Sequence, residues 1–90
     1  SLRNLETARG VVNSIIANVA QVSLSDDTTV VLIFGACSNI LVLNQNVPEI
    51  GSNVFWNGYK ITSNTYQVYS ALFFWLFIRY LWIYQYQIKR

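Results

Sequence analysis

The sequence predicts a mainly α fold in which an N-terminal amphipathic helix is followed by one or two transmembrane helices. Two observations lead to this prediction. Hydrophobic residues make up 53% of the chain and charged residues only 11%, against about 25% charged residues in ordinary soluble domains. Residues 66–86 form an aromatic, apolar run, and as a helix this run would be roughly 31 Å long, close to the thickness of a bilayer core. A small α+β domain is the alternative fold.

The first predicted unit, residues 1–25, is the amphipathic helix. Its apolar side chains recur at spacings of three and four residues, which is the period of one helix face. The opposite face carries Asn side chains, whereas helices that lie in a membrane interface prefer Lys and Arg. We therefore expect the helix to dock on a protein partner, in preference to a membrane surface or a coiled coil. Five side chains would make that contact: Leu5, Val12, Ile15, Val19 and Val22.

The second unit, residues 26–44, begins in a polar turn and continues as an apolar run. Adjacent carboxylates such as Asp26 and Asp27 point in different directions on a helix or a strand, so the turn favours capping or solvation over catalysis. From residue 28 onward the run has the shortest length that commonly spans a bilayer. The segment is therefore a candidate first transmembrane helix.

Two structures compete for this apolar run. As a helix, it would pack against a neighbouring helix through small and polar residues, namely Gly35, Ala36, Ser38 and Asn39. As β structure, it would form two strands at residues 30–34 and 40–43, joined by a turn. Cys37, the only cysteine of the chain, lies mid-run and is expected to pack as a small apolar group.

The third unit, residues 45–65, is a polar connection that contains a predicted β-hairpin. Asn57 and Gly58 are a strong signal for a two-residue turn, and β-favouring residues flank them. Three aromatic side chains beside this turn have two interpretations, a contact surface for a partner or a cover over the protein's own apolar face, and the second is preferred. They are Phe55, Trp56 and Tyr59.

The fourth unit, residues 66–90, is the predicted transmembrane helix with a basic end. Arg79 is the one charge inside the run. It is expected to snorkel toward headgroups, in preference to pairing with an acid of another chain or to lining an ion or proton path. The expected membrane anchors are Trp75, Arg79, Trp82, Tyr84 and Tyr86. If both apolar runs span, the positive-inside rule places both termini on the cytoplasmic side. The alternation within residues 80–90 also leaves a strand open as an alternative.

The composition argues against catalysis and against nucleic-acid binding. The chain has no histidine and a single cysteine, so the usual metal sites and acid–base pairs lack their residues. We expect no enzyme activity, cofactor, metal or small-molecule substrate. The six basic residues are scattered, whereas nucleic-acid binding normally requires a basic stripe with aromatic platforms.

These features together predict a structural or assembly subunit of a membrane complex or of a virion membrane layer. Its partners would be membrane lipid and other protein subunits, in a hetero- or homo-oligomer, and its location would be an integral one in a membrane. One alternative is a soluble α+β oligomeric interaction module. Another is a pore-forming protein, and the chain resembles the holin type in its size, its two candidate spans and its basic end.

Overall fold

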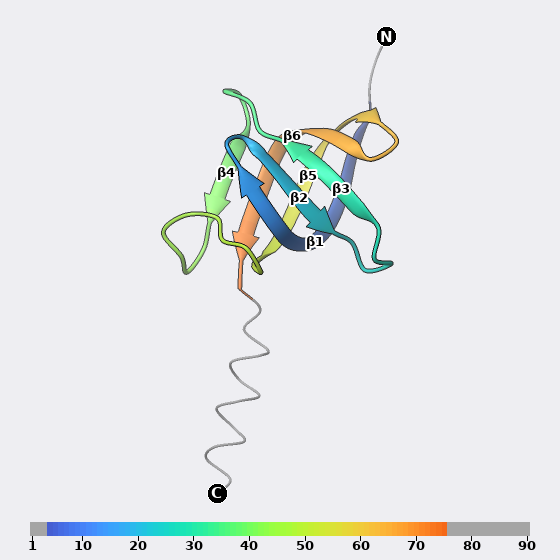
Figure 1. Ribbon diagram of the computed structural model, residues 1–90. Coiled ribbons are helices and arrows are strands. Elements are labelled where there is room, and N and C mark those ends of the chain that lie inside the picture. Colours follow the sequence, from blue (N-terminus) through green and yellow to red (C-terminus); the bar gives the residue numbers. More distant parts are fainter. Residues whose placement is uncertain (1–3, 76–90) are drawn as a thin grey trace, which may run out of the picture.

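Residues 4–75 are described by a computed structural model, and they form a single β-sheet with no helix (Figure 1). The predicted mainly α fold is therefore wrong, and the small α+β alternative does not match either. The sheet has six strands: β1 (Leu5–Ile16), β2 (Val19–Ser23), β3 (Thr29–Ile33), β4 (Asn39–Val42), β5 (Asn53–Thr62) and β6 (Thr65–Phe74).

The sheet closes on itself through five of these strands. Their order is β3-β2-β1-β5-β6, and β6 also pairs with β3. Strands β1, β2 and β3 follow one another as antiparallel neighbours, and β5 returns to lie beside β1, which is Greek-key connectivity. The pairings β3–β6 and β4–β6 are parallel. Strand β4 extends the sheet beyond the closed part, at the margin of the molecule in Figure 1.

The amphipathic helix predicted for residues 1–25 is replaced by strands β1 and β2. In β1, Gly10 and Val12 are buried while Val11 is exposed, which is the two-residue period of a strand. A bulge then shifts the register between Val12 and Ser14, so the next inward side chain, Ile15, follows Val12 at a spacing of three. The bulge therefore produces one of the spacings that imitate one face of a helix.

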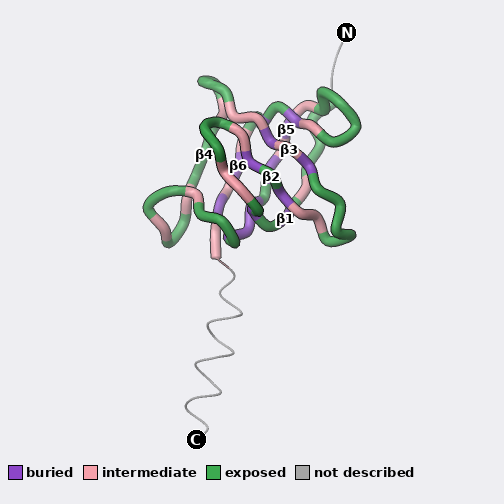
Figure 2. The backbone as a smooth tube through the Cα atoms, in the orientation of Figure 1, coloured by how far each residue is buried: buried purple, intermediate pink, exposed green. Residues whose placement is uncertain are grey.

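The core fills the inside of the closed sheet. Trp56 and Phe73 are its largest fully buried side chains, and the Trp56 ring lies 4.6 Å from the Tyr66 ring, centroid to centroid. Buried positions concentrate in the strands, and the turns are exposed (Figure 2). The apolar core residues are Val12, Ala20, Val22, Val30, Leu32, Val54, Trp56, Tyr66, Val68, Ala71 and Phe73.

The first candidate transmembrane segment forms strands β3 and β4, so the helix interpretation is wrong and the two-strand interpretation agrees with the structure. The two strands do not pair with each other. Each pairs with β6 in parallel, β3 along residues 65–67 and β4 along residues 70–73. Ser38 fixes the turn between them: its N–H donates to the Gly35 carbonyl at 3.1 Å, and its Oγ donates to the Val68 carbonyl of β6 at 2.6 Å.

The turn predicted at Asn57 and Gly58 is wrong, because both residues lie inside β5. The chain reverses six residues later, at Ser63 and Asn64, between Thr62 and its partner Thr65. Gly58 allows β5 and β6 to approach each other closely, because a Cβ there would collide with the Gln67 carbonyl group of β6. A glycine inside a strand often marks such a contact beside a bulge, and the β5–β6 register does shift between Asn57 and Gly58.

The second predicted transmembrane helix begins with residues that form β6 instead. Tyr66 and Val68 point inward, and after the bulge at Tyr69 the inward positions become Ala71 and Phe73. Because the inward positions change from even to odd residue numbers, the sequence shows no continuous alternation along this strand. Residues 4–75 contain no helix long and apolar enough to cross a membrane, so the integral-membrane prediction is corrected. The rest of that run, residues 76–90, lies outside the described residues.

The β1–β2 turn contains a strained residue, and its relief is a testable prediction. Ala17 has a φ of 52°, in the left-handed region that disfavours a Cβ by roughly 1–2 kcal/mol. We expect Ala17→Gly to stabilise the protein by about 0.5–1 kcal/mol, because strain relief exceeds the added entropy of the unfolded chain. Denaturant midpoints measure this. The control is Ala36→Gly, at an exposed turn position without positive φ, and it should destabilise the protein. Equal losses of stability in the two variants would show that Ala17 is not strained.

Candidate functional site

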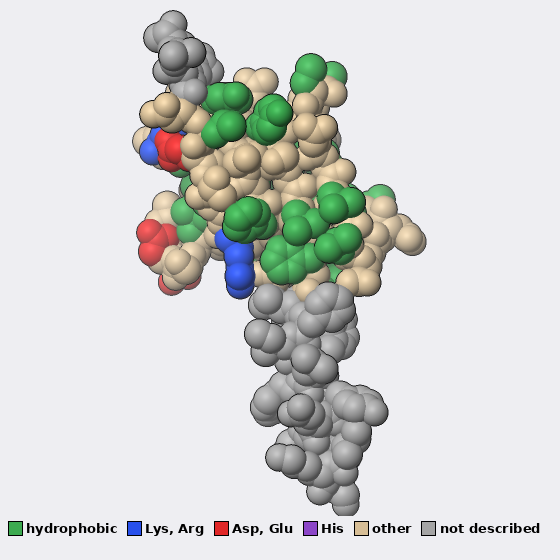
Figure 3. Space-filling view, turned by 180° about the vertical axis from the view of Figure 1, so that it is seen from behind, with side chains coloured by type: hydrophobic (Ala, Val, Ile, Leu, Met, Phe, Trp, Pro, Cys, Tyr) green, Lys and Arg blue, Asp and Glu red, His purple; other side chains and the backbone are tan. Residues whose placement is uncertain are grey.

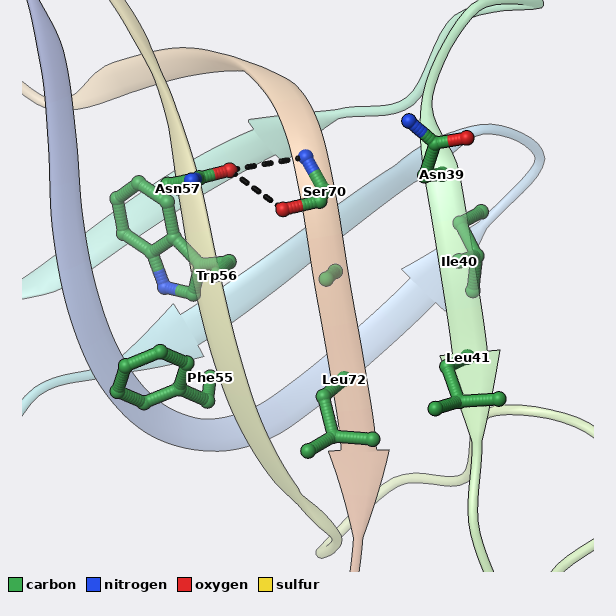
Figure 4. Close-up of a pocket in the computed structure, with 9 residues that line it drawn as sticks. Asn39, Ile40, Leu41, Phe55, Trp56, Asn57, Ser70 and Leu72 are labelled. Atoms are coloured by element: carbon green, nitrogen blue, oxygen red, sulfur yellow. Dashed lines mark hydrogen bonds between the residues drawn. The ribbon is translucent and has the colours of Figure 1, made fainter.

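The outer face of β5, β6 and β4 carries a row of apolar side chains, one from each strand. Phe55 of β5 is the register partner of Leu72 in β6, and Leu72 is the partner of Leu41 in β4. Phe55 is 49% exposed and Leu41 is 58% exposed. Figure 4 shows the three side chains level with one another across the strands. We call these three residues the apolar row.

A polar row lies beside the apolar row on the same face, two residues away along each strand. It consists of Asn57, Ser70 and Asn39, which are again register partners across β5, β6 and β4. Asn57 Oδ1 accepts hydrogen bonds from the Ser70 Oγ at 2.6 Å and from the Ser70 backbone N–H at 3.1 Å (Figure 4). The bulge in β6 frees that N–H from the regular ladder. The two rows line a groove of about 350 Å³.

Arg9 extends the apolar row onto β1, because it is the register partner of Phe55. Arg9 is exposed, and within residues 4–75 its guanidinium forms no ion pair. Figure 3 shows hydrophobic side chains gathered on the rear face of the molecule, with a Lys or Arg side chain beside them. This face therefore offers one cation at the end of an apolar strip.

Further exposed apolar residues lie on β4 and the loop that follows it. Their exposed fractions range from 39% at Leu43 to 63% at Ile50. Single exposed apolar side chains are normal, but contiguous patches mark interaction sites. These side chains are Ile40, Leu43, Val47 and Ile50, and of the four only Ile40 lines the groove.

The opposite side of the closed sheet, formed by β2 and β3, has different chemistry. Its outward residues are Val19, Gln21 and Ser23 in β2 and Thr29, Val31 and Ile33 in β3. None of these six is aromatic or cationic. The turns at the two ends of this face contain Ala17 with Asn18, and Ser63 with Asn64. The face therefore lacks both stacking platforms and positive charge.

The described residues carry a net negative charge, although the whole chain is at +2. Residues 4–75 hold two cationic side chains against four acidic ones, a net charge of −2. The acids Asp26 and Asp27 lie in the β2–β3 turn, where the hydrogen bonds from the Thr28 side chain and backbone N–H lower the pKa of Asp26. Asp26 thus accepts a hydrogen bond that stabilises this turn.

The five predicted partner contacts of residues 1–25 lie in different environments. Val12 and Val22 are fully buried in the core of the protein itself. Ile15 packs partly against that core, Val19 is half-buried at the start of β2, and Leu5 is 43% exposed at the start of β1. The structure therefore does not gather these residues on one surface.

The predicted helix-packing residues lie in and after the β3–β4 turn. Gly35 and Ala36 are exposed there, Ser38 fixes the turn to β6, and Asn39 belongs to the polar row. Cys37 is exposed in the same turn, in contrast to the packing role expected for it.

Of the predicted membrane anchors, only one lies within the described residues. The Trp75 indole N–H donates to the Glu49 carboxylate at 3.2 Å, which ties the end of β6 to the loop before β5. The other four, Arg79, Trp82, Tyr84 and Tyr86, lie outside the described residues.

The three aromatic side chains near Asn57 divide between the two interpretations given to them. Trp56 is buried in the core, as expected for a cover over the protein's own apolar face, whereas Phe55 lies outside in the apolar row. Tyr59 is half-buried. Sequence reasoning missed Leu41 and Leu72 as surface residues, because both lie in runs interpreted as transmembrane. Strand alternation from Phe55 was the available signal for an outward face.

A closed five-stranded Greek-key sheet is the architecture of the OB-fold, in which strands 2 and 3 and two adjacent loops bind oligonucleotides or oligosaccharides. Comparison of this chain with protein-family models, curated proteins and solved structures finds no match. The architecture alone does not establish a function.

Proposed function

We propose that this chain is a non-catalytic protein-binding module, and that the outer face of β5, β6 and β4 is its docking surface. The observation that carries the proposal is the apolar row, in which the exposed Phe55 and Leu41 flank the half-buried Leu72 in register on three adjacent strands. The partner is a protein that presents apolar side chains to this row and an acidic side chain to Arg9.

The groove chemistry supports a protein partner. Apolar side chains at the centre with polar groups at the rim are the usual anatomy of protein interfaces. Here the apolar row supplies the centre, and Asn57, Ser70 and Asn39 supply the hydrogen-bonding rim (Figure 4). Arginine and aromatic residues, phenylalanine included, are also enriched at the cores of protein interfaces, and Arg9 and Phe55 are neighbours on this face.

Nucleic acid is a weaker candidate despite the OB-like architecture. Phosphate contacts dominate nucleic-acid affinity and require clustered cations. The described part has a net charge of −2, and its two cations, Arg9 and Lys60, lie on different strands. The β2–β3 face, where OB-folds bind their ligands, carries no cation and no aromatic ring.

Site-specific photocrosslinking in the organism's own cells tests the proposal. A benzophenone amino acid replaces either Phe55 or Ile61 in the full chain. These two residues are matched controls, since both are apolar, both lie on β5, and they are 49% and 47% exposed. They stand roughly 20 Å apart along the strand. We expect a discrete protein adduct from position 55 only, at least fivefold weakened by Arg9→Glu.

Two outcomes would contradict the docking surface. Adducts of equal yield from positions 55 and 61 would show non-specific contact, and absence of any protein adduct from position 55 would show that the groove does not meet a protein. An adduct to RNA at position 55 would transfer the assignment to nucleic acid.

A further inference from the structure

Strand β4 has an open edge. It contacts β6 and no other strand of the described sheet. On its interior side lies an apolar cavity of about 370 Å³, between Ile40 and the tip of the β1–β2 hairpin. Ile15, Val19 and Phe34 also line this cavity. The position beside β4 is thus unoccupied by any strand within residues 4–75.

The direction of the backbone groups on β4 follows from one hydrogen bond. The N–H of Leu43 donates to the Phe73 carbonyl of β6 at 2.9 Å. Because successive residues of a strand direct their backbone groups to opposite edges, Leu41 also faces β6. The N–H and C=O groups of Ile40 and Val42 therefore point to the open edge. Four backbone hydrogen-bonding groups are available there to another strand.

The edge lacks the usual protection against pairing. Natural sheets guard exposed edges with charged residues, proline or bulges. No charged residue occurs between Asp27 and Glu49, β4 contains no proline, and its pairing with β6 is regular. Ile40 is 47% exposed and Leu41 is 58% exposed, so apolar surface is available on both faces of the strand.

We infer that β4 pairs with β4 of a second copy of this chain, antiparallel and about a twofold axis at Leu41. In this register Ile40 lies opposite Val42 of the other copy, and all four open backbone groups on each strand are paired. No like charges meet, since the edge is uncharged. The inference rests on the edge geometry and does not require the proposed function.

The same register joins the apolar rows of the two copies. Leu72 and Leu41 of one copy would continue into Leu41 and Leu72 of the other. Four backbone groups per copy form only four hydrogen bonds, so burial of these side chains contributes most of the affinity. Phe55 of one copy would stand about 24 Å from Phe55 of the other, five strand spacings away. A crosslink from Phe55 to a different protein is therefore distinguishable from self-association.

Cysteine crosslinking of the purified full chain tests the register. In a Cys37→Ser background, Leu41→Cys places two thiols opposite each other at the twofold axis, within the Cα separation that a disulfide requires. The matched control, Asn39→Cys, lies on the same face of the same strand, and its two copies would stand roughly 13 Å apart. We expect disulfide-linked dimer from Leu41→Cys at least tenfold faster than from Asn39→Cys.

A proline variant tests the edge without cysteine chemistry. Ile40→Pro removes an N–H that points to the open edge, so pairing with β6 should remain intact. We expect sedimentation analysis to show a dimer for the wild type and at least tenfold weaker dimerisation for Ile40→Pro, with an unchanged far-UV spectrum. A monomeric wild type at all concentrations, equal crosslinking rates of the two cysteine variants, or an intact Ile40→Pro dimer would overturn the inference.

Discussion

Trp56→Ala is expected to destabilise the protein by about 3–5 kcal/mol, which is the cost of deleting a large aromatic side chain from a packed core. Trp56 is 1% exposed and stacks at a tilt against Tyr66. Total stabilities of small domains are about 5–15 kcal/mol, so the variant should lose much of its cooperative unfolding transition. Urea denaturation followed by far-UV circular dichroism measures the loss.

Trp56→Phe is the control that separates packing from hydrogen bonding. The indole nitrogen of Trp56 is buried and has no hydrogen-bond partner among residues 4–75. Phenylalanine keeps an aromatic ring and removes this unpaired N–H, whose burial is itself unfavourable. We expect the loss to be less than half that of Trp56→Ala. Equal losses for the two variants would show that the ring does not pack as described.

Gly10→Ala is expected to cost about 2–3 kcal/mol, in the range of overpacked cores. A Cβ at this position of β1 would stand 2.5 Å from the Ser23 carbonyl oxygen and would also collide with Val22. Because one obstacle is backbone, strands β1 and β2 must separate to admit the methyl group. For a domain of this size, the melting temperature should fall by roughly 10–20 °C, which calorimetry measures.

Gly35→Ala is the matched control for the packing argument. Among the described residues, its added Cβ would meet only the Gln67 side chain, at 3.9 Å, an ordinary contact. Without a positive φ at this glycine, the variant should be neutral or slightly stabilising. If Gly10→Ala proves as mild as Gly35→Ala, β1 and β2 do not approach each other as closely as the structure shows.

The sequence contained the strand pattern of β1 and β6, but one bulge in each strand disguised it. In β1 the bulge after Val12 changes the spacing of inward residues from two to three. In β6 the bulge at Tyr69 transfers the inward positions from even to odd numbers. Local periodicity alone does not distinguish a bulged strand from a helix, because the extra residue is fixed by pairing with distant strands.

Strands β3 and β4 show which features the local sequence does predict. Both β-branched segments and the turn between them follow from residues 30–43, and they were recognised as one of two alternatives. Their pairing with β6, some thirty residues later, had no local signal. Pairing with β6 also explains why the turn prediction at Gly58 is wrong. This glycine leaves room for the Gln67 carbonyl group of β6, a contact that the local sequence does not reveal.

The candidate site was less predictable than the fold. Phe55 was recognised as a contact residue under one of two interpretations, and Asn39 was selected for helix packing. Leu41 and Leu72 become neighbours only through the parallel β4–β6 register. A groove assembled from three strands distant in sequence therefore requires the tertiary structure.

Both proposals depend on the parallel alignment of β4 with β6, and nuclear Overhauser contacts in the isotope-labelled full chain test it most directly. The structure predicts interstrand contacts that link Leu41 with Leu72 and Ile40 with Ala71, together with Leu32–Tyr66 contacts where β3 closes the sheet. Helical contacts between residues three apart over 30–43, without these interstrand contacts, would contradict the fold, the docking surface and the open edge together.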